Sequence, residues 1–420
     1  FHFHNHFIND RLDESTLRLR ASAGESLCLL IVKTEKQHFD RGRPLRVLFV
    51  NHMASMIRGG GETFDLEIAK ALNRMNCECT LLTSRPIWCG PHNRPDCIHT
   101  VYIRSPYTRC IPEAFIPGRW RLRVLDCRIF EHLAAKWAYS HRTDFDIVQA
   151  CEQVYFVEEW THRQTGIPVV MRLTSPDYYD PVGAVQKAAA VIASGTTMGK
   201  MKAGERPDCV DIPNAVDPRY FYPRPSEFRR NHGIGSADPL FIYAARMVPF
   251  KRHQWLLDVF ASLLPELPAA KLLLVGHGQL EDELKKYCAQ KGLLDSVIFM
   301  GQMPYEKMPE IYAAADIKVI ASDHRESFCF AALEAMAMEL PLVSTACGML
   351  PSLIGENEGG RIVDIDDAEG FRSALLSLAA DSSARRVIGA RNREYVIAHH
   401  RWDASARKLR TLYERLVALG

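Results

Sequence analysis

Two carboxylates in the run ESFCFAALEAMAMELPLVST are the residues best suited to do chemistry in this chain. Seven residues separate Glu326 from Glu334. Glu334 falls inside the apolar stretch Phe328–Met338, where a buried carboxylate is costly unless a hydrogen-bond donor reaches it. Glu326 follows a predicted strand at 317–321, at the expected start of a helix, whose free backbone N–H groups suit phosphate. Such a site fits a ligand with hydroxyl groups near a phosphate, as in a nucleotide sugar.

Two cations in AARMVPFKRHQWLL provide a second candidate group. Arg246 follows a predicted strand, and Lys251 and Arg252 precede a predicted helix. Cations there lie at the positive end of the helix dipole, which is the unfavourable end for them. They are either solvated side chains that cost about a few tenths of a kcal/mol or a clamp for an anion. Together with Glu326 and Glu334, Arg246 and Lys251 favour a diphosphate clamp.

Two glycine-containing loops could bring a backbone close to a ligand. Gly59, Gly60 and Gly61 precede Glu62 between a predicted strand and helix, and either a close approach or a flexible turn would explain them. Gly276 and Gly278 follow the strand LLLV without the third glycine of a dinucleotide fingerprint. The second loop alone indicates only a tight turn between a strand and a helix.

The first half of the chain offers weaker candidates. His52 follows the first predicted strand and would point into a cleft, where it is a candidate for proton transfer or substrate contact. The sequence Asp144-Phe145-Asp146 looks like a metal-binding DxD. It lies at the start of a predicted strand rather than at its end, so we interpret it as polar residues that mark the start of the strand. Arg246, Lys251 and a helix terminus could neutralise phosphate without a metal.

Residues 104–142 form a basic segment with interleaved aromatic side chains. They contain eight Arg or Lys residues against three acidic residues, a local net charge of +5. The segment could lie on an anionic bilayer, hold an anionic acceptor, or be a surface helix with some buried aromatics. Its pattern could also suit single-stranded nucleic acid, but no nucleic-acid motif accompanies it. Arg119 and Arg121 are the acceptor-side candidates within it.

Bulk composition is that of a globular protein with two domains. The 420 residues are 47% hydrophobic and 24% charged, and the net charge of +2 does not call for nucleic acid. The 12 cysteines include no CxxC, which excludes a zinc ribbon by spacing and gives no disulfide framework. Reduced thiols favour a cytoplasmic location. The apolar run Leu27–Val32 is too short to span a bilayer.

Short apolar strands alternate with helices in two series, which predicts two α/β domains with parallel sheets and a cleft between them. A helix is expected from Glu62 to about Met75, and others at His253–Leu264 and Leu280–Lys291. The segment 216–239, rich in Pro, Gly and charge, predicts a domain boundary. The expected strands of the first series are 46–50, 79–83, 147–150, 168–171, 190–194 and 210–213, and those of the second are 241–245, 271–275, 297–300, 317–321, 341–345 and 361–364.

Taken in order, these pieces resemble the retaining GT-B glycosyltransferases of family 4, also called glycosyl transferases group 1. The resemblance runs from about Arg46 to Leu416. It is carried by RVLFVN…GGGE, VDIPNAVDPRYFYP, AARMVPFKRHQWLLDVF, LLLVGHGQLEDEL, VIFMGQMP and the Glu326–Glu334 stretch, with RWDASARKLRTLYERL similar to the helix that crosses back to the first domain.

The resemblance implies an architecture. Two Rossmann-like parallel-sheet domains would face each other across a cleft, and a C-terminal helix would return to the first domain. The implied divisions are an extension at 1–43, an acceptor-side domain at 44–222, a nucleotide-sugar domain at 223–395 and a returning helix at 396–420.

The resemblance also implies roles for matching positions. Arg246 and Lys251 would neutralise the donor diphosphate, Glu326 would contact the donor sugar near the reacting centre, and Glu334 would hold the ribose hydroxyls. His52, Thr174, Arg119 and Arg121 would lie on the acceptor side. The remaining implied donor contacts are Ser327, Phe328, Cys329, Gly60, Gly61, Gly276, Met300 and Gly301.

Several positions depart from the family pattern. Cys329 and Glu339 replace glycines, and Thr174 stands where many members have a histidine. A side chain at Cys329 would narrow the sugar pocket, which could change donor choice or weaken the enzyme.

The implied activity is transfer of a hexose or hexosamine from a UDP- or GDP-sugar to an acceptor hydroxyl, with retention of configuration and without a metal or other cofactor. The acceptor would be a glycan, a lipid-linked sugar or a small molecule, in cell-surface polysaccharide, glycolipid or secondary-metabolite glycosylation. Expected partners include an anionic membrane touched from its cytoplasmic face, but no nucleic acid. The alternatives are a non-catalytic relative that binds a glycan or partner, and a nucleotide-sugar epimerase.

Overall fold

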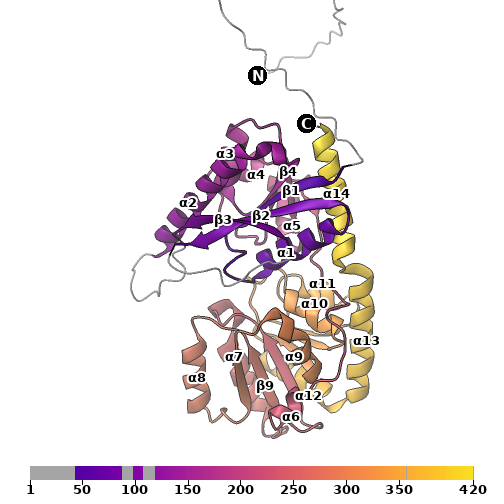
Figure 1. Cartoon of the computed structure of the whole chain (residues 1–420). Coiled ribbons are helices and arrows are strands. Elements are labelled where there is room, and N and C mark those ends of the chain that lie inside the picture. Colours follow the sequence, from indigo (N-terminus) through magenta and orange to yellow (C-terminus); the bar gives the residue numbers. More distant parts are fainter. Residues whose placement is uncertain (1–42, 88–97, 107–118, 356, 420) are drawn as a thin grey trace, which may run out of the picture. The chain divides into compact units, whose positions relative to one another are not determined.

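Two parallel β-sheets organise the chain (Figure 1). The computed structural model describes residues 43–87, 98–106, 119–355 and 357–419, without the side chains of residues 119–121. Within these residues the first sheet has seven strands in the order β3-β2-β1-β4-β5-β6-β7, and the second has six in the order β10-β9-β8-β11-β12-β13. The predicted α/β fold with two Rossmann-like sheets is therefore confirmed. The predicted extension at 1–43 lies outside the described residues, apart from Arg43.

The first sheet follows the predicted strands, with one addition. Every described pairing in it is parallel. The edge strand β3 was not predicted, because most of its residues are only partly buried and its sequence HTVYIRS is not a continuous apolar run. The strands are β1 (Leu45–Val50), β2 (Cys77–Pro86), β3 (His99–Ser105), β4 (Ile147–Cys151), β5 (Val169–Arg172), β6 (Ala190–Ala193) and β7 (Val210–Asp211).

Helices cover both faces of the first sheet. The helix α1 packs on one face, and α2 and α3 pack on the other. The helix α1 begins at Gly60, two residues before the predicted start. The helices are α1 (Gly60–Asn73), α2 (Arg119–Ser140), α3 (Val154–His162), α4 (Ala184–Lys187) and α5 (Gly195–Lys200).

The second sheet is also covered on both faces. The helices α9, α10 and α11 pack on one face, and α7, α8 and α12 on the other. Its strands are β8 (Leu240–Ala244), β9 (Lys271–Val275), β10 (Val297–Gly301), β11 (Ile317–Ile320), β12 (Leu342–Thr345) and β13 (Gly360–Val363). Its helices are α6 (Phe228–Asn231), α7 (His253–Leu263), α8 (Glu281–Gln290), α9 (Met308–Ala314), α10 (Phe330–Ala337), α11 (Leu350–Gly355) and α12 (Ala368–Ala380).

The last helix in sequence packs on the first sheet. After α13 (Ser382–His399), α14 (Trp402–Leu419) runs beside α1 (Figure 1). Trp402, Leu409 and Tyr413 enter the same apolar core as β1 and α1, and the Tyr413 hydroxyl donates to Oε1 of Gln149 at 2.6 Å. The expected return of the C-terminal helix to the first domain is confirmed. No helix among the described residues has both the length and the apolar character needed to cross a membrane.

Candidate functional site

The predicted cations and carboxylates gather where β8 and β11 end. These two strands are neighbours in the second sheet, so their carboxyl ends lie side by side. Arg246 and Lys251 follow β8, and Glu326 follows β11, while Glu334 lies on α10. In an open parallel sheet this edge is where ligands bind.

Lys251 and Glu326 form a buried ion pair. The Lys251 ammonium contacts Oε2 of Glu326, and the two side chains are only 12% and 8% exposed. The Ser322 hydroxyl donates to the same carboxylate oxygen at 3.0 Å. Burial lowers the pKa of Lys251, but the Glu326 carboxylate outweighs this and raises it above its usual value. Lys251 is therefore not a solvated cation.

The other two cations differ from each other. Arg252 adopts a left-handed backbone conformation, and its guanidinium contacts the carbonyl of Ile365 and, at 2.7 Å, Asp366. It is thus held by the protein and not solvated at the helix end. Arg246 is exposed, lies 6.0 Å from the ring centroid of Phe250, and pairs with no carboxylate among the described residues. Arg246 is the cation most open to an anionic ligand.

Glu334 has the hydrogen-bond donor that its apolar surroundings require. The hydroxyl of Tyr312, a fully buried residue of α9, donates to Oε2 of Glu334 at 3.0 Å. Burial raises the pKa of Glu334, and the Tyr312 hydrogen bond and the charge of Lys318 oppose the increase. Glu334 is only partly buried, so a ligand can still approach it.

The helix after Glu326 begins later than the sequence suggested. α10 starts at Phe330, so Glu326 lies in the loop before it and not at the helix N-terminus. Gly348, at φ +55°, supports this loop, because a Cβ there would lie 2.4 Å from the carbonyl oxygen of Glu326. The amide of Met349 donates to the carbonyl of Ser327 at 3.2 Å. These tertiary contacts hold the loop outside α10, so the helix begins later than helix propensity alone predicts.

The three residues between Glu326 and α10 each make a different kind of contact. The Ser327 hydroxyl lies 3.2 Å from that of Thr197, near the start of α5. The ring of Phe328 packs edge-on against that of Phe330, 5.7 Å between centroids. Cys329 has φ −92°, so a side chain causes no backbone strain there, and its thiol is buried in the core beneath the loop. Narrowing of a sugar pocket by Cys329 stays a prediction.

The glycine after β9 has a packing role. Gly276 has φ +139°, and a Cβ on it would lie 2.1 Å from the carbonyl oxygen of Ala245. Its amide donates to the carbonyl of Gly301 at 2.8 Å, at the end of β10 next to Met300. The glycine therefore lets the ends of β8, β9 and β10 meet beside Arg246.

Gly60 and Gly61 form the first turn of α1, and not a loop as the sequence suggested. A Cβ on Gly60 would lie 3.3 Å from the ring of Phe330, and one on Gly61 would lie 3.3 Å from the sulfur of Cys151. Small residues allow the helix to begin close to these neighbours.

The structure describes the side chains of two acceptor-side candidates, His52 and Thr174. His52 is 3% exposed and stacks on Phe130 at 4.5 Å, with Nδ1 3.7 Å from the sulfur of Cys127 and Nε2 3.8 Å from Asp126. It therefore packs under α2 instead of pointing into open space. The side chains of Arg119 and Arg121 lie outside the described part of the structure.

Thr174 reveals a residue that the sequence analysis missed. Its hydroxyl and amide donate to Oε1 of Glu152, at 2.6 and 2.7 Å. Glu152 follows β4 with φ +55°, a conformation that is uncommon for a non-glycine residue. Its position at the carboxyl end of a strand was the available signal.

A second missed residue is Lys318 on β11. It is fully buried, and its ammonium lies 3.4 Å from the carbonyl oxygen of Ala244. Burial lowers the pKa of Lys318 to about 8. His253, also buried, is close enough that Lys251 and Lys318 add to the burial that lowers its pKa to about 3. The only sequence signal was a lysine inside an apolar strand.

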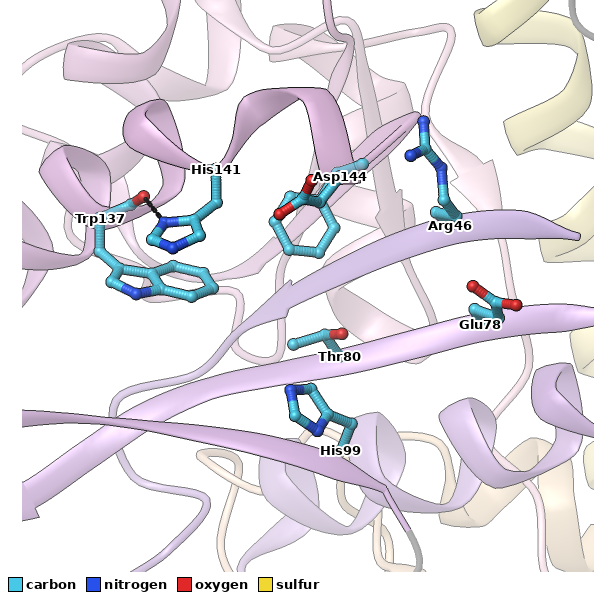
Figure 2. Close-up of a pocket in the computed structure, with 8 residues that line it drawn as sticks. Arg46, Glu78, Thr80, His99, Trp137, His141 and Asp144 are labelled. Atoms are coloured by element: carbon cyan, nitrogen blue, oxygen red, sulfur yellow. Dashed lines mark hydrogen bonds between the residues drawn. The ribbon is translucent and has the colours of Figure 1, made fainter.

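The Asp144-Phe145-Asp146 motif is structural. Asp146 accepts hydrogen bonds from Arg43 at 2.7 Å and from Arg46 at 2.8 Å. A hollow of about 490 Å³ lies beside Asp144, at the end of the first sheet where β1, β2 and β3 begin. Figure 2 shows residues that line it, among them Arg46, Glu78 and His99 from these three strands. Trp137 and His141 stack on each other there at 4.2 Å. None of the candidate donor or acceptor residues whose side chains the structure describes lines this hollow.

Part of the chain matches a known protein family. Residues 225–414 match the family model described as glycosyl transferases group 1. The chain is 28% identical over 207 residues to N-acetyl-alpha-D-glucosaminyl L-malate synthase of Bacillus anthracis, covering 49% of this chain and 53% of that protein. It is 29% identical over 207 residues to a GDP-mannose-dependent phosphatidylinositol monomannoside mannosyltransferase of Mycobacterium tuberculosis, covering 47% and 54%. The chain thus spans about half the length of these curated relatives.

Solved structures share the fold over most of the chain. Sucrose-phosphate synthase of Thermosynechococcus elongatus superposes with a TM-score of 0.73 at 20% identity, covering 90% of this chain and all of that one. The Anabaena protein HepE in complex with UDP-glucose gives 0.70 at 18% identity, covering 88% of this chain and all of that one. At such identities the likeness establishes the fold alone.

Proposed function

We propose that the protein is a glycosyltransferase, since residues 225–414 match the family model described as glycosyl transferases group 1. In the proposed reaction a hexose or hexosamine moves from a nucleotide sugar to an acceptor hydroxyl. Relatives named for GDP-mannose support this donor class. The acceptor is proposed to be a glycan, a lipid-linked sugar or a small molecule.

One observation carries the proposal. A buried Lys251–Glu326 ion pair, an exposed Arg246 and a partly buried Glu334 gather at the carboxyl ends of neighbouring parallel strands. Burying an ion pair costs free energy that apolar residues would not cost. A site that must bind both charged phosphates and sugar hydroxyls gives a reason to retain this ion pair.

Each group has a proposed task. Arg246 binds the diphosphate, and Lys251 joins it when the donor displaces part of the Glu326 contact. Glu326 then accepts a hydrogen bond from the donor sugar near the reacting carbon, and Glu334 accepts hydrogen bonds from the ribose hydroxyls. These cations perform the charge neutralisation that a metal performs in other sites, so we propose transfer without a metal.

We propose that the anomeric configuration is retained. The bond from the anomeric carbon to the acceptor oxygen forms on the face that the diphosphate leaves. The acceptor proton passes to the departing phosphate oxygen. Within this scheme Glu326 positions the sugar and stabilises the charge that develops on it.

The test is donor turnover by the purified protein. A panel of UDP-, GDP-, ADP- and TDP-sugars is supplied without acceptor, and released nucleotide is followed over time, with and without EDTA. We expect slow hydrolysis of one donor that EDTA does not stop. Glu326→Gln should abolish it while the circular dichroism spectrum is unchanged, and Glu369→Gln, at an exposed position of α12, should have no effect.

Other outcomes would point to the alternatives. Turnover near the wild-type rate in Glu326→Gln would contradict the proposed role of the carboxylate. A donor whose sugar is converted without release of nucleotide would indicate an epimerase. Binding of no nucleotide at all would favour a non-catalytic protein.

A further inference from the structure

We propose that Lys318 is a positioning residue of the donor site, whose buried ammonium keeps Glu334 ionised and ready to accept hydrogen bonds from the ribose. The inference rests on the proposed function, because that function assigns the ribose to Glu334. It adds a residue that lies below the site and that the sequence analysis did not select.

Lys318 is placed by the sheet so that its side chain lies in the layer beneath the site. It pairs in register with Ile242 on β8 and Leu342 on β12. Paired residues of neighbouring strands share a face, and these two belong to the core under α9 and α10. The Lys318 ammonium reaches the end of β8, 3.4 Å from the carbonyl oxygen of Ala244.

Polar and aromatic groups surround this ammonium in place of water. Its nitrogen lies 5.5 Å from the ring centroid of Tyr243 and 5.8 Å from that of Tyr312. Tyr312 is also the hydrogen-bond donor to Glu334. Lys318 is therefore linked to Glu334 both through its charge and through a shared aromatic neighbour.

Titratable groups lie around Lys318 on several neighbouring elements. Two lysines and two glutamates make the cluster neutral when all four are ionised, and Arg58 adds a further positive charge near Glu334. The titratable groups concerned are Tyr243 on β8, Lys251 in the turn before α7, His253 on α7, Tyr312 on α9, Glu326 and Cys329 in the loop before α10, and Glu334 on α10.

Packing alone does not account for a lysine at this position. The other residues of β11 are apolar and fully buried, and a leucine or methionine would fill the space without loss of hydration. A buried ammonium is explained if it stabilises the ionised form of a neighbouring group. Burial raises the pKa of Glu334, and Lys318 opposes that increase. Without Lys318 the pKa of Glu334 would lie higher, and its carboxylate would be protonated over a wider range of pH.

The test compares Lys318→Met with the wild-type protein. Dissociation constants for UDP, GDP and ADP are measured by calorimetry from about pH 6 to 9. The ratio of the dissociation constants of the two proteins cancels the effect of the titration of the nucleotide phosphate. Because Glu334 is easier to protonate in the variant, affinity for the bound nucleotide should fall by up to about tenfold at the acid end of this range. The ratio should approach one as the pH rises, because Glu334 then ionises in both proteins and Lys318 of the wild type loses its proton above about pH 8.

Three controls separate positioning from a structural role. Lys318→Arg retains the charge and should retain the affinity. Lys271→Met, on β9 of the same sheet, should bind as the wild type does. In a Glu334→Gln background, Lys318→Met should cause no further loss. Thermal unfolding of Lys318→Met should not fall below that of the wild type, since a buried charge is replaced by an apolar side chain of similar length.

The outcomes are distinct. Equal affinity of Lys318→Met and wild type at low pH would overturn this inference and leave the proposed function standing. A loss that is the same at every pH, or that persists with Glu334→Gln, would assign Lys318 to structure and overturn it as well. If the wild-type protein binds none of the three nucleotides, the proposed function fails and the inference falls with it.

Discussion

At the scale of single residues, Tyr312 supplies the one described side-chain hydrogen bond to Glu334, at 3.0 Å. A hydrogen bond to a charged group contributes about 1.5–3 kcal/mol. We therefore expect Tyr312→Phe to weaken nucleotide binding by roughly tenfold, because Glu334 becomes easier to protonate and less well oriented. Calorimetric titration with the nucleotide that the wild type binds measures this. Tyr287→Phe, which removes a surface hydroxyl bonded to Asp258, is the matched control and should bind normally.

A second residue carries backbone strain. Glu339 stands where the family pattern has glycine, and its φ is +61°. The left-handed conformation costs an L-residue about 1–2 kcal/mol, whereas glycine adopts it freely but loses more entropy on folding.

We expect Glu339→Gly to raise the free energy of unfolding by about 0.5–1 kcal/mol, measured by urea denaturation. Glu283→Gly, at an exposed position in the first turn of α8, makes the same replacement at a helical position and should lower stability. Loss of stability in both variants would show that Glu339 is not strained.

At the scale of elements, α2 supplies the cap for α3. Glu131, 3% exposed, accepts a hydrogen bond from the amide of Phe156 at 2.9 Å, in the first turn of α3. A carboxylate suits a helix N-terminus, but burial raises the pKa of Glu131 to about 8. In the unfolded chain its pKa would be near 4.5.

Since the folded protein binds this proton more tightly, the stability from Glu131 is complete below about pH 4.5 and is lost as the pH rises through about 8. We expect the wild type to lose on the order of 3 kcal/mol relative to Glu131→Gln between about pH 5 and 9. The glutamine keeps an acceptor oxygen but cannot ionise. Parallel urea titrations at both ends of this range measure the difference, and equal pH dependence of the two proteins would contradict the assigned pKa.

The elements also show what the sequence could reveal. Buried parallel strands such as β8 and β9 are short apolar runs, so their positions were predictable. The start of α10 was not, since contacts around Gly348 hold Glu326 and Ser327 outside the helix. Arg246, Lys251, Glu326 and Glu334 could be selected from residue type and spacing. Lys318 could not, because its role depends on which side chains the sheet places around it.

At the scale of the whole molecule, the last helix completes the core of the first sheet. Leu409 and Tyr413 on α14 are fully buried, and Tyr413 bonds to Gln149 on β4. Arg410 donates to the carbonyl of Met75 after α1 at 2.7 Å. The first sheet therefore acquires its full core only when the end of the chain is in place, which makes its stability depend on contacts distant in sequence.

This dependence predicts different effects of two leucine truncations in the same helix. Leu409→Ala removes buried apolar volume and should lower the free energy of unfolding by about 2–4 kcal/mol. Leu419→Ala, at a side chain that is 79% exposed, should change it by less than about 0.5 kcal/mol. Hydrogen exchange should show the Leu409→Ala loss in β1 and β4, whose residues share the core with α14. Nucleotide affinity should be unchanged, since Leu409 lies in the core of the first sheet, and the residues proposed to hold the donor lie around β8, β11 and α10. Unaltered exchange in β1 and β4 would mean that the first sheet folds without its C-terminal helix.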